Sequence, residues 1–401
     1  MPSLRLMAIG ALCALGFGFV PAILQAASDD AAGRALTAAY NSSGQELFLT
    51  LAEKPGNIVL SPYSIGAAMA MALAGARGEN EVEMARVLGL QLSPNQVNAA
   101  NATILANLNA ASSASFQLLV ANAVMLAKKG DAISEAYVAT LRANYAAEVF
   151  RGADLATVNG WVKEKTKGKI DSILDQIDPS TALILLDAVY FKAAWQTPFN
   201  TKATQDETFR LVSGETEVPM MHIHGAFALA ERPGYRAVRL PYAGERIGMV
   251  VMLPDADVAS LVQRLDGAEM QSLIAALHSS DREVDISLPR FHASYGANLV
   301  ETFTALGMHR AFDPSAADFS GMTGKPPSQL PLAIDQVVHR AVIDVAEQGT
   351  EAAAVTGVTV VATAMAPRPS ETFRVDRPFL FAIVDDNTGA ILFEGRIVDP
   401  R

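Results

Sequence analysis

The stretch Glu347-Gln-Gly-Thr-Glu-Ala-Ala-Ala-Val-Thr-Gly-Val-Thr-Val-Val-Ala-Thr363 contains no proline and, after Gly349, a single charged residue, Glu351. Its other side chains are mostly small or β-branched. Successive side chains of a strand point to opposite faces, and Glu351 falls on one face only. The opposite face carries only small or apolar groups: Thr350, Ala352, Ala354, Thr356, Val358, Val360 and Ala362. The pattern predicts a strand with one face fitted to a core.

The residues after this stretch have a different character. Pro367-Arg-Pro-Ser370 follows almost directly and is typical of an exposed turn. A segment that can form a buried strand but ends as a loop suggests two conformational states. A plain edge strand or an alanine-rich linker would show the same pattern, so the residues alone leave these interpretations open.

The second half of the chain around this stretch consists mainly of predicted strands. Thr181–Phe191 is a continuous apolar run, as expected for a strand buried on both faces. The turn sequence Asp386-Asn-Thr-Gly389 predicts a hairpin between the last two strands. Further strands are predicted at Tyr235–Leu240, Ile247–Leu253, Glu283–Leu288, His339–Ala346, Phe379–Asp385 and Ala390–Ile397.

The first half is mainly helical. Ser61-Pro62 predicts a helix start, because serine caps the first turn and proline has no amide to leave unpaired there. This helix runs to Gly75, a second begins near Glu79 and stops at Gly89, and a third runs from Thr157 to Gly168. Helices followed by strands, without regular alternation, predict an α+β fold.

The composition limits the classes of function. The chain has 401 residues, half of them apolar, and a net charge of -11. An acidic chain is a poor partner for nucleic acid or anionic membranes. No tandem repeat or long linker divides the chain, so we expect one domain over residues 35–401. We also expect the protein to be a monomer.

The N-terminal residues predict export. Arg5 is the only charged residue before Asp29, and the apolar run Leu6–Ala27 ends in small residues. Residues 1–27 therefore predict a signal peptide and a secreted or periplasmic protein, with a retained membrane anchor as the alternative. Cys13, the only cysteine, lies in this segment, so we expect no disulfide or thiol chemistry in the mature chain.

Catalytic sequence motifs are missing. The chain contains no G-x-S-x-G, H-E-x-x-H, S-x-x-K or G-x-x-x-x-G-K-[ST] motif. His222 and His224 would share one face of a strand, but no third ligand lies nearby in the sequence. We therefore predict that the protein is not an enzyme and has no metal or cofactor.

The segment Glu347–Ala354 resembles the hinge of the serpin family, and other serpin-like motifs follow one another in order along the chain. This resemblance implies an α+β serpin-like fold, with N-terminal helices around a large mixed sheet, a second, smaller β-sheet region and an exposed reactive loop at about 347–370. The other motifs are Asn57–Ile65, Val158–Ile170, Ala188–Phe199, Leu288–Phe291, Val338–Val342, Arg377–Phe379 and Phe393–Pro400.

The resemblance also implies a mechanism. A serine protease would attack the loop and form an acyl-enzyme, and the cut loop would insert into the large sheet before the acyl bond is hydrolysed. Family spacing from Glu347 places the reactive bond at Thr363–Ala364, with Ala362, Ala364 or Met365 as alternatives for the residue before the cut. These uncharged residues favour elastase-like or subtilisin-like proteases. Alternatives are a non-inhibitory serpin that acts as a binding protein, and an inhibitor of cysteine proteases.

Two groups of site residues follow from the resemblance. Trp195 matches the residue at the top of the sheet, and Ser61, Ser64 and His339 match the polar cluster beneath its centre. The family usually has asparagine where this chain has Asp187, and a buried aspartate must be paired or protonated; a pH-sensitive opening of the sheet is one hypothesis. The hinge residues are Glu347, Gly349, Thr350, Glu351, Ala352, Ala353 and Ala354.

Overall fold

A computed structural model describes residues 19–113, 115–126, 132–178, 181–278, 281–350 and 370–401, with side chains from residue 31 onward. Three predictions lie outside these residues: the reactive bond Thr363–Ala364, the hinge residues Glu351 to Ala354, and most of the signal peptide. These stay predictions.

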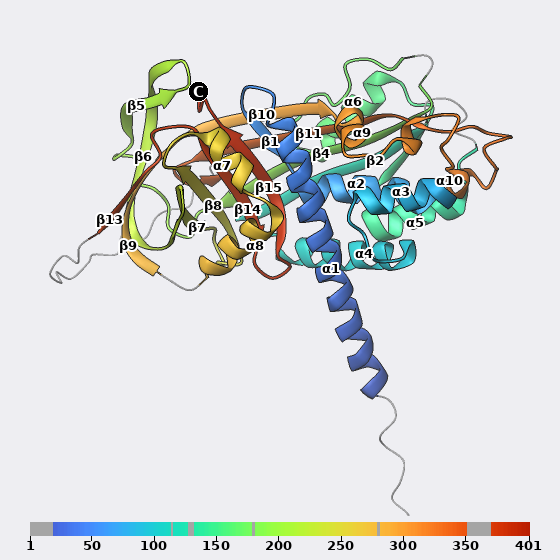
Figure 1. The fold of residues 1–401 in the computed structure, drawn as a ribbon, viewed down its shortest axis with the longest axis horizontal. Coiled ribbons are helices and arrows are strands. Elements are labelled where there is room, and N and C mark those ends of the chain that lie inside the picture. Colours follow the sequence, from blue (N-terminus) through green and yellow to red (C-terminus); the bar gives the residue numbers. More distant parts are fainter. Residues whose placement is uncertain (1–18, 114, 127–131, 179–180, 279–280, 351–369) are drawn as a thin grey trace, which may run out of the picture.

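One of the two β-sheets has six strands and runs across the middle of the molecule (Figure 1). It is mixed, because β11 lies parallel to β4 and β2 parallel to β3, whereas the other pairs are antiparallel. Its strands in spatial order are β10 (Phe291–Asn298), β11 (Ile334–Ala346), β12 (Gly349–Thr350), β4 (Leu183–Ala194), β2 (Phe116–Leu126) and β3 (Glu148–Arg151).

The second sheet has nine strands, and only its β13–β9 pair is parallel. The predicted hairpin is confirmed, since β14 and β15 begin and end where the sequence indicated. In spatial order the strands are β1 (Ile58–Leu60), β15 (Ala390–Ile397), β14 (Phe379–Asp385), β8 (Ile247–Pro254), β7 (Tyr235–Pro241), β6 (Gly214–Arg232), β9 (Asp281–Pro289) and β13 (Glu371–Arg374), with β5 (Gln205–Leu211) on β6.

Helices cover both faces of the six-stranded sheet (Figure 1). α6 lies on one face, and α2 to α5 lie on the other. The helices are α1 (Phe19–Leu51), α2 (Pro62–Gly75), α3 (Gly78–Val87), α4 (Pro94–Ala111), α5 (Glu135–Tyr145), α6 (Leu155–Lys165), α7 (Val258–Arg264), α8 (Gly267–Ala276), α9 (Val300–Ala305) and α10 (Ser320–Thr323).

Strand β4 is apolar on both faces because each face meets a separate core. Leu185 and Val189 join the larger core, which contains most of α2, whereas Ile184 and Leu186 join a smaller core beneath α6. Helix α2 begins as predicted: the Ser61 side chain accepts a hydrogen bond from the backbone of the first turn, and proline follows it.

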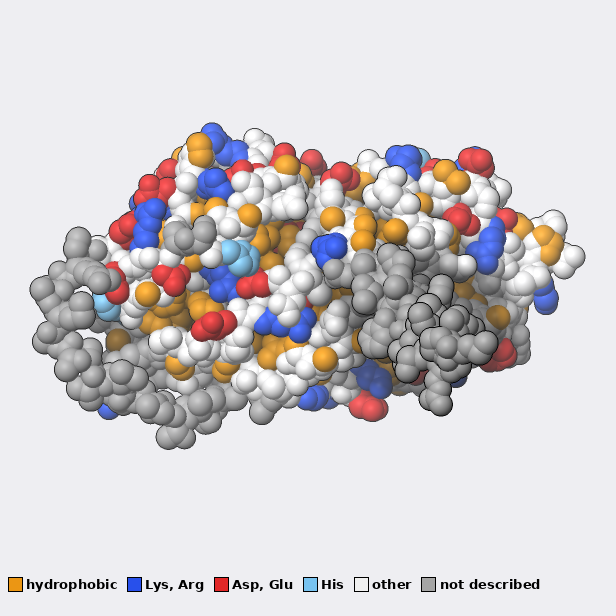
Figure 2. All heavy atoms as spheres, turned by 90° about the horizontal axis from the view of Figure 1, so that it is seen from below, with side chains coloured by type: hydrophobic (Ala, Val, Ile, Leu, Met, Phe, Trp, Pro, Cys, Tyr) orange, Lys and Arg blue, Asp and Glu red, His pale blue; other side chains and the backbone are white. Residues whose placement is uncertain are grey.

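The N-terminal helix α1 begins at Phe19, inside the predicted signal peptide, and continues well past the predicted cleavage point. Within the described residues, no helix combines the length and apolar character that a membrane crossing needs. On the face shown in Figure 2, acidic and basic side chains are interspersed, and neither sign forms a continuous track.

Candidate functional site

The last described residues before the reactive-loop segment already lie inside the six-stranded sheet. The chain turns back after β11, and Gly349 and Thr350 form β12 between β11 and β4. Beyond this point β11 and β4 pair directly with each other, from Ile334 to Val342 on the β11 side. We call the β11–β4 boundary the seam. Within the described residues, β12 separates the two strands at one end of the seam, and β11 and β4 pair directly from Val342 back to Ile334.

Gly349 fits this position because it has no side chain. Its φ of +146° is rarely adopted by other residues, and a Cβ there would lie 2.0 Å from the backbone oxygen of Ala193. Thr350 is fully buried, and its hydroxyl lies 2.6 Å from the Tyr242 hydroxyl. Burial raises the pKa of Tyr242 well above its ordinary value, so this phenol stays protonated.

Trp195 closes the open end of the seam, as the resemblance implied. Its ring stacks on Tyr242 with centroids 4.4 Å apart. Its indole N–H donates to the backbone oxygen of Ala346 at 2.9 Å, and its backbone N–H donates to Gln348 at 3.0 Å. One aromatic side chain therefore holds the turn that leads from β11 into β12.

Glu347 anchors the same turn by its carboxylate. Arg290 donates to it at 2.5 Å and Thr204 at 2.7 Å. Burial opposes ionisation of Glu347, but these hydrogen bonds outweigh burial and hold the pKa of the carboxyl below its ordinary value. The hinge is thus fixed by an ion pair on one side of Gly349 and by a buried hydroxyl contact on the other.

The predicted polar cluster forms midway along the closed part of the seam. Asp187 on β4 and His339 on β11 are directly opposite in register, and His339 Nδ1 lies 2.7 Å from the Asp187 carboxyl. The Ser64 hydroxyl, from α2 below, donates to the same carboxyl, and the Ser61 hydroxyl accepts from the Ser64 backbone at 3.2 Å. All four residues are buried.

The Asp187–His339 contact crosses the seam. Any strand that enters between β4 and β11 must separate these two side chains. His339 Nε2 is also buried and has no hydrogen-bond partner in the described structure. The cluster therefore acts as a side-chain lock between the two strands.

Tyr242, Arg290 and Thr204 were missed as site residues. Arg290 lies within the Leu288–Phe291 motif, so the resemblance pointed to its position but gave it no role. No spacing in the sequence connects Tyr242 or Thr204 to the hinge, since each meets it only through the fold.

The two histidines of β6 bind separate carboxylates. His222 lies 2.8 Å from Glu207, and His224 lies 2.8 Å from Asp285. The described residues contain no group of three or more histidine, cysteine or acidic side chains that could hold a metal ion.

Comparisons with known proteins agree with this architecture. The family model for Serpin (serine protease inhibitor) matches residues 38–400, and the chain belongs to this family. The chain is 36% identical to an uncharacterized serpin-like protein of Thermococcus kodakarensis, over 90% of this chain and 85% of that protein. It is also 36% identical to the leukocyte elastase inhibitor of Bos taurus, over 91% of this chain and 99% of that protein.

Solved structures give the same result for the fold. The native state of the thermophilic serpin tengpin superposes with a TM-score of 0.80 at 31% identity, over 90% of this chain and 94% of tengpin. The serpin-like α+β fold predicted from the sequence is confirmed.

Proposed function

We propose that this chain is not an enzyme but an inhibitor of serine endopeptidases that is consumed in the reaction. The observation that carries the proposal is β12, because it starts a new strand in the seam and leaves the rest of the seam to be filled. Cleavage of the loop would free the residues after Thr350 to continue into the sheet.

The covalent step is an interrupted acyl transfer. The protease serine attacks the Thr363 carbonyl carbon, the bond to the Ala364 nitrogen breaks, and Ala364 leaves as a free amine. The remaining chain stays bound to the serine as an ester. Insertion of the loop would carry the protease along and distort its catalytic site before water hydrolyses this ester.

The register of β12 predicts where each loop residue would go. Gly349 pairs with Ala194 and Thr350 with Ala193, and on the other side Thr350 pairs with Val345. Continued along both strands, this register places Thr356 between Asp187 and His339. The Thr356 hydroxyl would then replace part of the contact that insertion breaks.

The same register predicts which side chains become buried. Thr350 lies opposite a β4 residue of the larger core, so the alternate residues after it would face that core too. These are the small and apolar residues that begin at Ala352 and end at Ala362. Burying a valine such as Val358 is favourable by roughly 1.5–3 kcal/mol, so insertion has a driving force.

The target class is proposed from the reactive bond and from a relative. Residues 362–365 are uncharged, which fits proteases with a small, apolar specificity pocket. The related bovine protein is named leukocyte elastase inhibitor. We propose elastase-like or subtilisin-like proteases as targets, bound as a covalent acyl complex.

The test is incubation with elastase, subtilisin, trypsin and papain, followed by denaturing gels and mass spectrometry. We expect a denaturant-stable complex with elastase or subtilisin, and a released peptide that begins at Ala364. A complex with trypsin alone would contradict the proposed bond. Cleavage without any complex would identify a non-inhibitory serpin. A complex with papain alone would identify cysteine proteases as the targets.

Export is a separate part of the proposal. It is supported by the apolar run Leu6–Ala27 and the small residues at its end. N-terminal sequencing of the protein from its native host should begin near residue 27 or 28. A mature chain that keeps residues 1–27 would contradict it.

A further inference from the structure

Helix α1 is attached to strand β15 near both ends of the strand. At one end, Asn41 of α1 accepts a hydrogen bond from the backbone N–H of Ile391 at 3.0 Å and donates to the backbone oxygen of Gly389 at 2.8 Å. At the other end, the Arg396 side chain donates to backbone oxygens just after the helix. These oxygens belong to Ala52, Lys54 and Gly56. The helix and the strand therefore lie side by side (Figure 1).

Glu394 lies on β15 between these two attachment points. Side chains two positions apart on a strand share a face, so Glu394 and Arg396 both face α1. The cross-strand neighbours of Glu394 are apolar: Leu60 on β1 and Ala382 on β14. Glu394 is only 2% exposed, and its Oε1 atom has no hydrogen-bond partner among the described residues. A carboxyl in such surroundings is stable only as the neutral acid.

The neighbouring strands supply no charge that would compensate an ionised Glu394. Arg396 already gives its guanidinium to four hydrogen bonds with backbone oxygens. Asp385, at the far end of β14, is bound by Arg246 at 2.6 Å. Strand β1 carries no charged residue. Tyr295 on β10 stays neutral, because burial raises the pKa of its phenol.

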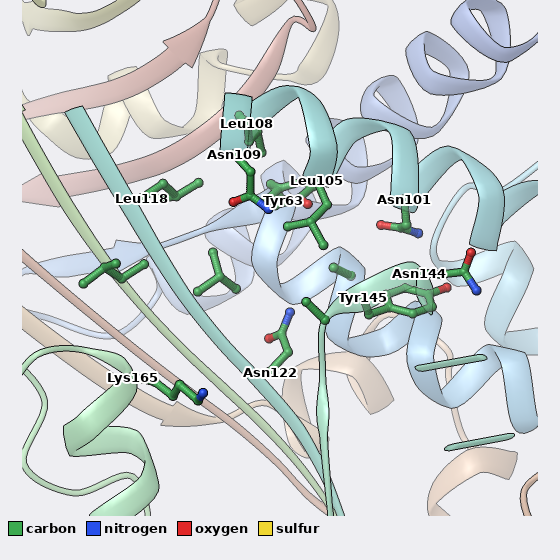
Figure 3. Close-up of a pocket in the computed structure, with 14 residues that line it drawn as sticks. Tyr63, Asn101, Leu105, Leu108, Asn109, Leu118, Asn122, Asn144, Tyr145 and Lys165 are labelled. Carbon is green, nitrogen blue, oxygen red and sulfur yellow. The ribbon is translucent and has the colours of Figure 1, made fainter. Parts of the chain in front are cut away.

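The helices that pack against β15, α1 and α2, supply no compensating charge either. Tyr40 of α1 is turned toward α4, where Asn101 donates to its hydroxyl at 2.8 Å. Tyr63 of α2 lines the cavity beside β2 (Figure 3). The charged side chains that the structure describes on α1 and just after it are exposed: Arg34, Glu46, Glu53 and Lys54.

Burial raises the pKa of Glu394 to about 8. In the unfolded chain this carboxyl ionises at its ordinary value, near 4.5. Between these two values the unfolded chain binds fewer protons than the folded chain, so stability falls as pH rises. The loss ends above the folded-state value, where the carboxyl is ionised in both states.

We propose that the α1–β15 interface is a pH-sensitive contact, in which α1 stays docked while Glu394 holds its proton and loosens when this carboxyl ionises. Gln45 supports this assignment. It lies one turn after Asn41 on the same face of α1, and its Oε1 atom is also buried without a hydrogen-bond partner in the described structure. Ionisation would add a negative charge to an interface that already contains an unpaired acceptor.

The first test asks whether Glu394 is protonated, by infrared spectroscopy of the full chain and of Glu394→Gln. Glutamine matches the neutral acid in shape but has no proton to release. The difference spectrum at pH 6 should contain the carbonyl stretch of one protonated carboxyl, and this band should be lost by pH 10. Absence of the band at pH 6 would overturn the proposal.

The second test compares melting temperatures. Wild type and Glu394→Gln should melt within a degree of each other at pH 4, where the carboxyl is neutral in both states. At pH 9 the variant should melt about 5 °C higher, because only the wild type carries the buried charge. Glu46→Gln, in the same helix but exposed, is the matched control and should not show this change with pH. The same difference between wild type and Glu394→Gln at both pH values would overturn the proposal.

The third test locates the effect by hydrogen exchange, with both proteins at the same pH so that intrinsic exchange rates are equal. At pH 9, peptides from the second half of α1 should exchange severalfold faster in the wild type than in Glu394→Gln, whereas peptides from α6 should not differ. Equal exchange of α1 in both proteins would contradict the loosening of this helix. The three measurements involve neither the reactive loop nor a protease, so their outcome is independent of the proposed function.

Discussion

The entry of the seam and its middle are built from different chemistry. At the entry, β12 contains Gly349, where the space leaves no room for a side chain, and the fully buried Thr350. The Trp195–Tyr242 stack lies beside them. Midway along, Asp187 and His339 join the two strands through a buried polar contact. The first region admits a strand and the second resists one. This difference predicts that a strand that continues from β12 meets resistance at the Asp187–His339 contact.

The largest expected effect comes from blocking the strand where it would reach the lock. Thr356→Arg places a long charged side chain between Asp187 and His339 on the buried face, where the packed core has no room for it and desolvation of the guanidinium costs several kcal/mol. Covalent complex with elastase should fall by 100-fold or more, while the loop is still cleaved. Denaturing gels at matched protease ratios measure both products.

The control for this variant is Thr359→Arg, on the opposite face of the same segment. It should keep most of the complex, because its side chain would face away from the larger core. If both variants lose the complex equally, the face assignment from the β12 register is wrong.

The next effect comes from removing the lock itself. His339→Ala leaves the buried carboxyl of Asp187 with Ser64 as its remaining side-chain partner, which should lower the free energy of unfolding by about 3 kcal/mol. It should also speed spontaneous insertion of the uncut loop. Denaturant melts and the rate of activity loss at 37 °C measure the two effects.

Asp187→Asn tests the same contact with a smaller change than His339→Ala. It keeps one acceptor oxygen at the same place, so its loss of stability should be clearly smaller than that of His339→Ala. An equal loss in both variants would contradict this expectation, because the acceptor oxygen that Asp187→Asn retains would then contribute nothing to the contact across the seam.

A smaller effect is expected at the open end. Gly349→Ala puts a Cβ against the Ala193 backbone and should cost about 1–3 kcal/mol, since β12 must leave the sheet. Gly324→Ala is the matched control, because Gly324 also has positive φ but no atom lies within 4 Å of the added Cβ. Similar losses of melting temperature in both would assign the effect to backbone strain alone.

The smallest effect concerns Glu347. The pKa of its carboxyl is depressed in the folded state, so its stabilising contribution is present above the ordinary pKa of glutamate and is lost as pH falls through the depressed value. Glu347→Gln should therefore cost about 1 kcal/mol at pH 7 and almost nothing in strong acid. Melts of both proteins from pH 7 down to pH 3 measure this difference, and a constant difference across that range would contradict it.

Local signals made part of the fold predictable. Ser61 and the proline after it fixed the start of α2, and the turn before Ala390 fixed the last hairpin. Strand β11 begins at Ile334, five residues before the predicted start. Its first residues are extended because they pair with β4, and their own sequence shows no strand pattern. The sequence indicated a strand around His222 and His224 but not the full length of β6, since its mixed polar and apolar residues carry no clear period.

Less of the site could be predicted from residue patterns. Asp187 and His339 are 152 positions apart, and only the resemblance to serpins brought them together. The pairing of Gly349 with Ala194 and the contact of Thr350 with Tyr242 depend on the assembled sheet. Such long-range contacts produce no periodic pattern in the sequence. The position of β12 in the sheet could therefore be learned only from the structure.

The central claim is that the segment after Thr350 completes a strand in the seam once the loop is cut. The most direct measurement is the melting temperature of the protein before and after cleavage of the loop by a protease that is then removed. Insertion buries several apolar side chains, so we predict an upward shift of roughly 10 °C or more. An unchanged or lower melting temperature after cleavage would contradict the account.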